Sequence, residues 1–156
     1  MKKATATSAL SPEDQIATFL AKFDPGMASS IRSLRAAVRK RLPTAFELVY
    51  DNYNFLVFGF CSAPRASTCI ASLAANAKGS ILSFYYGADL ADPHNILQGS
   101  GTQNRFLRLE SPATLANPEV EALIAAAIAQ AKTPLPATIP GPTIIQSISA
   151  KQRPRR

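Results

Sequence analysis

The spacing of the apolar residues changes at Pro43, and this change constrains the fold more than any other feature of the sequence. Before Pro43 the apolar residues recur every three or four positions, which is the repeat of a helix with one buried face. Ser11-Pro12 and Asp24-Pro25 precede the two apolar stretches, and such pairs are typical of helix starts. The sequence therefore predicts two helices, over residues 12–23 and 25–42.

After Pro43 the apolar residues alternate with polar ones or form short continuous runs, and both patterns are typical of β-strands. Such stretches are present at residues 46–51, 55–61, 68–75, 80–86 and 105–109. The first four are joined by links of hairpin length, which favours antiparallel pairing. Asn117-Pro118 then begins a third helix, whose apolar stripe runs to Ala131.

The order of these elements predicts an α+β fold. Two helices precede about five strands and one helix follows them, so the helices can cover one face of an antiparallel sheet in a two-layer sandwich. We predict a flexible N-terminus at 1–10, an α+β domain at 11–132 and a Pro-rich, basic C-terminal tail at 133–156. Docking of the tail's apolar residues on the domain is left open, and its end from Lys151 onward is predicted to be solvated.

The formal net charge of +7 is located mostly at the ends of the chain. The basic residues there are Lys2, Lys3, Lys151, Arg153, Arg155 and Arg156. Basic ends attract phosphates without reading a sequence, so the tail predicts at most weak, non-specific contact with nucleic acid. Arg32, Arg35 and Arg39 share one face of the second helix, where a charged stripe usually faces solvent.

Composition also argues against membrane proteins and thiol enzymes. No apolar run approaches the roughly 18 residues of a membrane helix, and the first ten residues lack the apolar core of a signal peptide. We therefore predict a cytoplasmic protein with no membrane contact. Cys61 and Cys69 are predicted to be buried free thiols, and nothing in the sequence places His94 beside them as a base. We predict no enzymatic activity and no cofactor.

Residues 87–109 form the longest stretch without a regular apolar repeat, and a loop of this length is either functional or held by its own contacts. Gly99, Ser100, Gly101 and Thr102 are predicted to form a backbone nest for a phosphate or carboxylate, with Arg105 beside it. The alternative is that both glycines satisfy special backbone angles and the nearby arginines pair with acids.

Two further sets of residues are candidate sites. Asp89, Asp92 and His94 supply two carboxylates and one imidazole, which can bind a metal, although an Asp-Pro pair also commonly begins a turn. Tyr53, Tyr85 and Tyr86 are candidates for lining a small-molecule pocket. Because successive residues of a strand point to opposite faces, Tyr85 and Tyr86 are predicted to diverge.

Two segments and the helix after them resemble the YdhG-like family, a bacterial family of small domains. The segments read VRKRLPTAFELVYDNYNFLVF and ILSFYYGADLADPHNILQGSGTQNRFLRLES, and the similarity covers residues 11–131. Its most specific positions are Gly87, Leu90, Asp92, Pro93, Leu97, Gly99, Gly101 and Arg105. The resemblance implies a frataxin-like fold and, through relatives regarded as iron chaperones, a role in iron binding.

The chain departs from the family pattern at several positions. Thr102 and Gln103 stand where members often carry a lysine, which weakens an anion site that depends on that lysine. The turn at residues 51–54 lacks the Gly and Pro that members often have. An iron surface needs clustered carboxylates, but the first helix and its end offer only Glu13, Asp14 and Asp24.

These features predict a non-enzymatic binding or adaptor domain for an anionic small molecule or a protein partner. A frataxin-like iron-binding role and a nucleic-acid accessory role through the basic ends are the two alternatives. An open sheet edge also leaves a homodimer possible.

Overall fold

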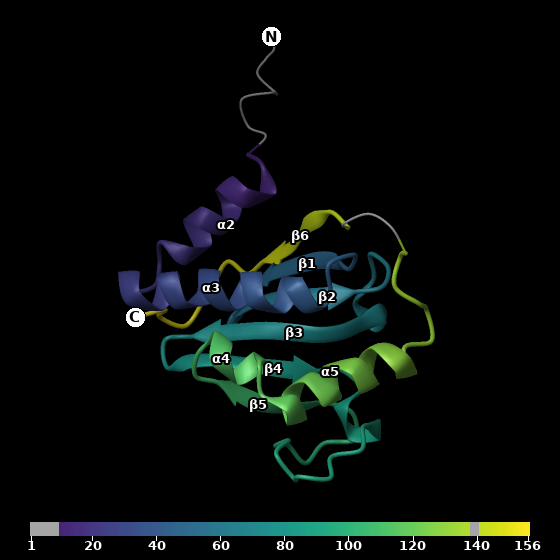
Figure 1. Cartoon of the computed structure of the whole chain (residues 1–156). Helices are drawn as coiled ribbons and strands as arrows, with labels where there is room; N and C mark the ends of the chain where they lie inside the picture. Colours follow the sequence, from purple (N-terminus) through teal and green to yellow (C-terminus); the bar gives the residue numbers. More distant parts are fainter. Residues whose placement is uncertain (1–9, 138–140) are drawn as a thin grey trace.

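The computed structural model describes residues 10–137 and 141–156. Its helices are α2 (Pro12–Leu20), α3 (Pro25–Arg41), α4 (Pro112–Leu115) and α5 (Pro118–Gln130), with short 3-10 turns η1 (Ala66–Thr68) and η2 (Gly87–Asp89). Its strands are β1 (Phe46–Asp51), β2 (Leu56–Cys61), β3 (Cys69–Asn76), β4 (Gly79–Phe84), β5 (Arg105–Leu109) and β6 (Thr143–Ile148) (Figure 1). The predicted flexible N-terminus falls outside the described residues, except for Leu10.

The helices begin where the sequence signals predict. The Ser11 hydroxyl accepts a hydrogen bond from the Asp14 backbone N–H at 3.1 Å, and Asn117 caps α5 in the same way through the Glu119 N–H at 2.9 Å. In both cases a proline fills the next position, where a missing N–H does no harm. Ser111 caps the single turn of α4, which the sequence analysis did not predict.

The sheet has six strands in the order β5-β4-β3-β2-β1-β6. Strands β1 to β5 pair antiparallel with their neighbours, but β6 pairs parallel with β1. The α+β class is therefore confirmed, whereas the prediction of about five strands in an antiparallel sheet is wrong: the sheet is mixed. The extra strand comes from the predicted tail, because Ile144 and Ile145 find apolar neighbours beside β1.

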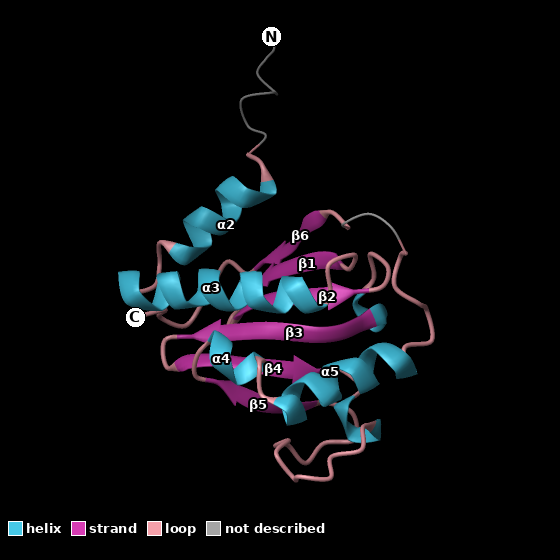
Figure 2. Cartoon of the chain, viewed as in Figure 1, coloured by secondary structure: helices cyan, strands magenta, loops and turns pink. Residues whose placement is uncertain are grey.

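The main core lies between the sheet and the helices, and Figure 2 shows α3 and α5 lying across the same face of the sheet. The apolar stripe of α3 is buried in this core except for Met27, which is partly buried, and alternate residues of β2 are fully buried. The buried residues of these two elements include Ile31, Leu34, Val38, Leu56, Phe58 and Phe60. Burying each such side chain contributes roughly 1.5–3 kcal/mol, so this layer is a main source of stability.

The end of the chain packs against the domain. The Arg155 side chain is 2% exposed, and its Nη2 lies 3.0 Å from the buried carboxylate of Asp51. Lys22 binds the other oxygen of that carboxylate at 2.6 Å. Arg156 donates to the carbonyls of Ala21 and Lys22, just after the end of α2. The prediction of a solvated basic end is therefore wrong for Arg155, because the buried Asp51 supplies its counter-charge.

No helix in the described part of the chain is long and apolar enough to cross a membrane.

Candidate functional site

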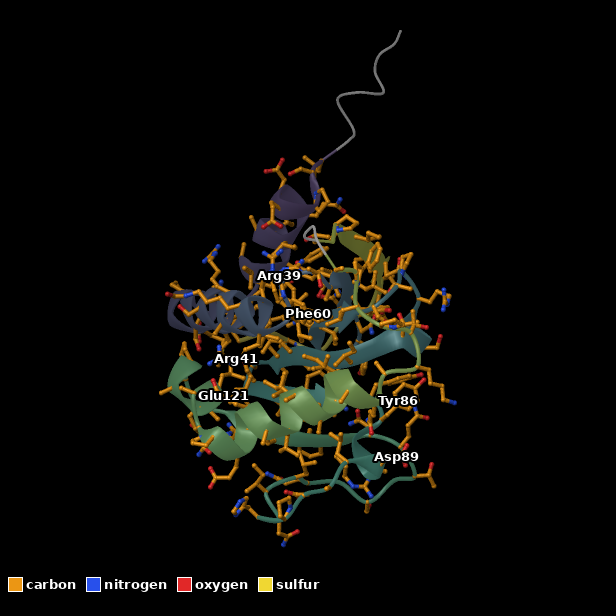
Figure 3. The ribbon with its side chains drawn as sticks, turned by 45° about the vertical axis from the view of Figure 1, so that its right-hand side comes forward. Arg39, Arg41, Phe60, Tyr86, Asp89 and Glu121 are labelled. Atoms are coloured by element: carbon orange, nitrogen blue, oxygen red, sulfur yellow. The ribbon has the colours of Figure 1, made fainter. Side chains whose placement is uncertain are left out.

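A cavity of about 250 Å³ lies where three distant segments meet: the β2–β3 connection, the start of the long loop and the C-terminal end of α5. It is lined by Ser62, Ser67, Thr68, Cys69, Ile70, Tyr86, Asp89, Ala127, Gln130, Ala131, Lys132 and Thr133. Figure 3 shows Tyr86 and Asp89 near one another at this end of α5. Residues with hydroxyl, amide or charged side chains alternate with apolar ones in the lining, so the cavity can hold a molecule with both polar and apolar parts.

Hydrogen bonds tie the three segments of the wall together. The Tyr86 hydroxyl donates to the Ser67 carbonyl at 2.7 Å, and the Gln130 side-chain amide donates to the Tyr86 carbonyl at 3.1 Å. The Thr68 hydroxyl contacts the carbonyls of Ala63 and Arg65 at 2.8 and 2.7 Å, which fixes the β2–β3 connection. The cavity is therefore held in place by its own wall.

Gly87 places the loop against the sheet. A Cβ atom added at Gly87 would lie 2.6 Å from the Cβ of Arg105 and 2.8 Å from its backbone nitrogen, closer than real Cβ contacts allow. Only glycine lets the chain leave β4 this close to β5. Tyr86 and Asp89, on either side of Gly87, are brought to the cavity by this close approach.

Asp89 and Lys132 are the two charged residues of the lining. Both are exposed, and neither side chain makes a hydrogen bond or an ion pair within the described ranges. The cavity therefore offers one anionic and one cationic group that its own structure does not use.

The three tyrosines predicted for a pocket have different surroundings. Of the three, Tyr86 lines the cavity. The Tyr85 ring packs edge-on against the Tyr86 ring, with the two ring centroids 4.8 Å apart. The prediction that Tyr85 and Tyr86 diverge is wrong because β4 ends at Phe84, so strand alternation no longer applies to them. Tyr53 is in the β1–β2 turn, at the other end of β2, where Arg153 lies 5.5 Å from its ring centroid.

The predicted anion nest is an exposed turn, and Arg105 beside it hydrogen-bonds to backbone carbonyls of the same loop. Gly99 has a φ of +121°, which favours glycine. The Arg105 guanidinium donates to the Gly101 and Asn104 carbonyls at 2.7 and 2.8 Å and so holds the loop closed. Ser100 and Thr102 are exposed. Anion binding by residues 99–102 stays a prediction.

The structure does not bring Asp89, Asp92 and His94 together in a geometry that could hold a metal. The Asp92 carboxylate accepts hydrogen bonds from the backbone N–H groups of Ile96 and Leu97 at 3.0 and 2.9 Å. Asp89 lines the cavity, whereas His94 lies in a separate groove that residues of α5 also line. No group of three or more His, Cys, Asp or Glu residues that could hold a metal occurs among the described residues.

Most of the predicted arginine stripe on α3 is also used internally. Arg35 binds the buried carboxylate of Glu47 at 2.7 and 2.8 Å and pairs with Glu13. Although burial opposes its charge, these two acids raise the pKa of Arg35. Arg39 donates to the Ala45 carbonyl at 2.7 Å. Of the three arginines, only Arg32 is exposed, so this face of α3 offers little free positive charge to bind nucleic acid.

Comparisons of the chain with protein-family models, with curated proteins and with solved structures find no match. The YdhG-like and frataxin-like resemblance therefore stays a prediction.

The sequence analysis missed that Cys61 and Cys69 are neighbours. They lie directly opposite one another on β2 and β3, and both are buried free thiols. The closeness of the two thiols lowers the pKa of Cys69 and raises that of Cys61. The available signal was the short break at Ser62–Arg65: a hairpin at that break places the end of one strand opposite the start of the next.

Proposed function

We propose that this protein is a non-enzymatic binding domain whose ligand is a small molecule with one acidic and one basic group, held in the cavity beside Tyr86. The observation that supports this proposal is the placement of Asp89 and Lys132, neither of them paired among the described residues, in the wall of one cavity. Compared with the sequence-based prediction of an anionic ligand, the cavity adds a requirement for a basic group.

The size of the cavity limits the ligand. Pockets for drug-sized ligands span about 300–1,000 Å³. The cavity, at about 250 Å³, is smaller and fits a small metabolite better than a nucleotide or a peptide. Because three hydrogen-bonded segments form its wall, the ligand would enter a site that is largely formed in advance.

The charges divide the ligand into two ends. Lys132 would bind the acidic group, and Asp89 would bind the basic group. The C-terminal end of α5 contributes Gln130 and carries partial negative charge, so it also favours a basic group or a hydrogen-bond donor. Free amino acids carry both groups and are the simplest class that satisfies these requirements.

The proposal includes no catalytic step. His94, the one histidine of the sequence, lies in a separate groove and supplies no general base at the cavity.

The test is a thermal-shift screen of the full chain with amino acids, dicarboxylates and diamines at matched concentrations. We expect amino acids to raise Tm, because a ligand at 100 times its Kd stabilises the folded state by about 2.7 kcal/mol. Asp89→Asn and Lys132→Gln should each weaken binding at least about tenfold, since each removes a charge-assisted hydrogen bond.

Asp14→Asn and Lys151→Gln are matched controls, because these exposed charged residues lie outside the cavity. They should bind every stabilising compound as the wild type does. If Asp89→Asn and Lys132→Gln also bind as the wild type does, the proposed site is wrong. If dicarboxylates alone stabilise the protein and Arg105→Ala removes the effect, the site is instead the turn at residues 99–102.

A further inference from the structure

Cys61 and Cys69 have a backbone geometry that suits a disulfide. They are directly opposed on the antiparallel strands β2 and β3. Directly opposed residues in such a pair have Cα atoms about 4.5–5.5 Å apart. A disulfide needs a Cα separation of about 4.4–6.8 Å, a range that includes the spacing of opposed residues.

The two thiols differ in their access to solvent. Cys69 lines the cavity and keeps 8% of its surface exposed, whereas Cys61 is 1% exposed. The register of β2 and β3 shifts between Phe60 and Cys61, so the pair lies at a β-bulge. Cys69, at the start of β3, lines the cavity. A small reagent in the cavity would therefore meet Cys69 first.

The surroundings of Cys69 favour its thiolate form over that of Cys61. Its sulfur lies 3.2 Å from the Ser72 hydroxyl. The neighbouring Cys61 thiol and Ser72 hydroxyl lower the pKa of Cys69 despite its burial. The thiolate is the form of cysteine that attacks peroxides.

We propose that Cys61 and Cys69 form an oxidisable pair, in which hydrogen peroxide that enters the cavity reacts with Cys69 and Cys61 then closes a disulfide. This inference goes beyond the proposed function and does not rest on it, because peroxide needs neither Asp89 nor Lys132.

The reaction balances in two steps. The Cys69 thiolate attacks one peroxide oxygen, the O–O bond breaks, and Cys69 becomes a sulfenic acid while hydroxide leaves and takes up a proton as water. The Cys61 sulfur then attacks the Cys69 sulfur, loses its proton and displaces the hydroxyl as a second water. The two thiols lose two electrons in total, and peroxide gains them.

The test uses the reduced full chain, treated with a small excess of hydrogen peroxide, alkylated under denaturing conditions and weighed without reductant. We expect a monomer that resists alkylation and has lost about 2 Da, and we expect dithiothreitol to restore both thiols. Cys61→Ser should stop at a sulfenic acid on Cys69, heavier by about 16 Da and trapped by dimedone. Cys69→Ser should react at least about tenfold more slowly than Cys61→Ser, because Cys61 does not line the cavity and is less exposed than Cys69.

Asp14→Asn and Lys151→Gln, exposed residues outside the cavity, should oxidise at the wild-type rate. Equal rates for the two single-cysteine variants, or wild-type thiols that stay fully alkylatable when free cysteine is consumed, would overturn the proposal. If a serine variant does not fold, the wild-type protein oxidised in the presence of dimedone answers the question: label on Cys69 supports the proposal, and label on Cys61 contradicts it.

Discussion

Arg155 carries a positive charge into the interior at the end of β1. Its Nη2 donates to Asp51 at 3.0 Å and to the Asn52 carbonyl at 2.6 Å, and its guanidinium lies 5.9 Å from the Phe23 ring centroid. Arg155→Ala should lower the free energy of unfolding by about 3 kcal/mol, because a buried carboxylate then loses one of its two cations. Urea denaturation at neutral pH measures this loss.

Arg153→Ala is the matched control for this substitution. Arg153 is exposed, and its guanidinium lies over the ring of Tyr53, a contact that contributes about 0.5–1 kcal/mol. An equal loss of stability in both variants would mean that Arg155 is not buried against Asp51.

Single residues show most clearly where sequence reasoning stops. A basic run near the end of a chain resembles a solvated tail, and Arg155 becomes an interior residue only through Asp51, 104 positions earlier. Similarly, Arg35 could be assigned to a helix face from its spacing, but its partner Glu47 lies on a strand whose position depends on the whole fold. Spacing predicts which face a residue occupies and leaves its partner undetermined.

At the scale of elements, β6 joins the sheet through a close backbone contact. A Cβ added at Gly141 would lie 2.5 Å from the carbonyl oxygen of Ala45, just before β1. Gly141→Ala should therefore destabilise the protein by about 1–3 kcal/mol, since backbone atoms on both sides must move apart. Thermal or urea denaturation checks this prediction.

Gly101→Ala is the control, because no atom lies within 4 Å of its added Cβ and its φ is not in the left-handed region. We expect it to change the free energy of unfolding by less than about 0.5 kcal/mol. Indistinguishable variants would mean that the segment before β6 does not pack on β1.

Elements defined by local signals could be predicted from the sequence, and elements defined by distant partners could not. The helix starts depend on Ser or Asn capping residues followed by proline, and the hairpins depend on short links between apolar runs. Strand β6 follows a proline-rich segment and pairs only with a strand far back in the chain. The cavity was partly anticipated: Tyr86 and Asp89 were assigned to two separate sites, while Gln130 and Lys132 join them only because α5 packs across the sheet.

At the scale of the whole molecule, internal ion pairs predict sensitivity to acid. Burial opposes the charge of Asp51, but hydrogen bonds from Lys22, Gln152 and Arg155 outweigh it and lower its pKa below the ordinary value of 3.8. The Arg35 hydrogen bond likewise lowers the pKa of Glu13 below 4.5. The unfolded chain therefore binds protons more readily than the folded one, so this stability is complete above the ordinary values and is lost as the pH falls through the folded-state values.

Urea midpoints measured at pH 7, about 4 and about 3 should fall in that order, with most of the decline below about pH 4.5. Asp51→Asn should lower the midpoint at pH 7 and flatten the decline, whereas Asp14→Asn should keep the wild-type profile. A midpoint for the wild type that does not change down to pH 3 would contradict this prediction.

The overall class was predictable because the order of helices and strands along the chain largely decides which layers can form. That order predicts an α+β domain. It does not predict the parallel pairing of β6 with β1, which makes the six-stranded sheet mixed.

This parallel pairing also determines when the sheet is completed during folding. Thr143 reaches its partner Glu47 across 96 positions of sequence, whereas the hairpin strands need only short loops to close. Contacts between residues so far apart in sequence form late, because the chain loses conformational entropy before the pairing can stabilise the fold. Until then β1 is an open edge with unpaired backbone groups, and it is the place where a refolding molecule is most exposed to strand exchange with another copy.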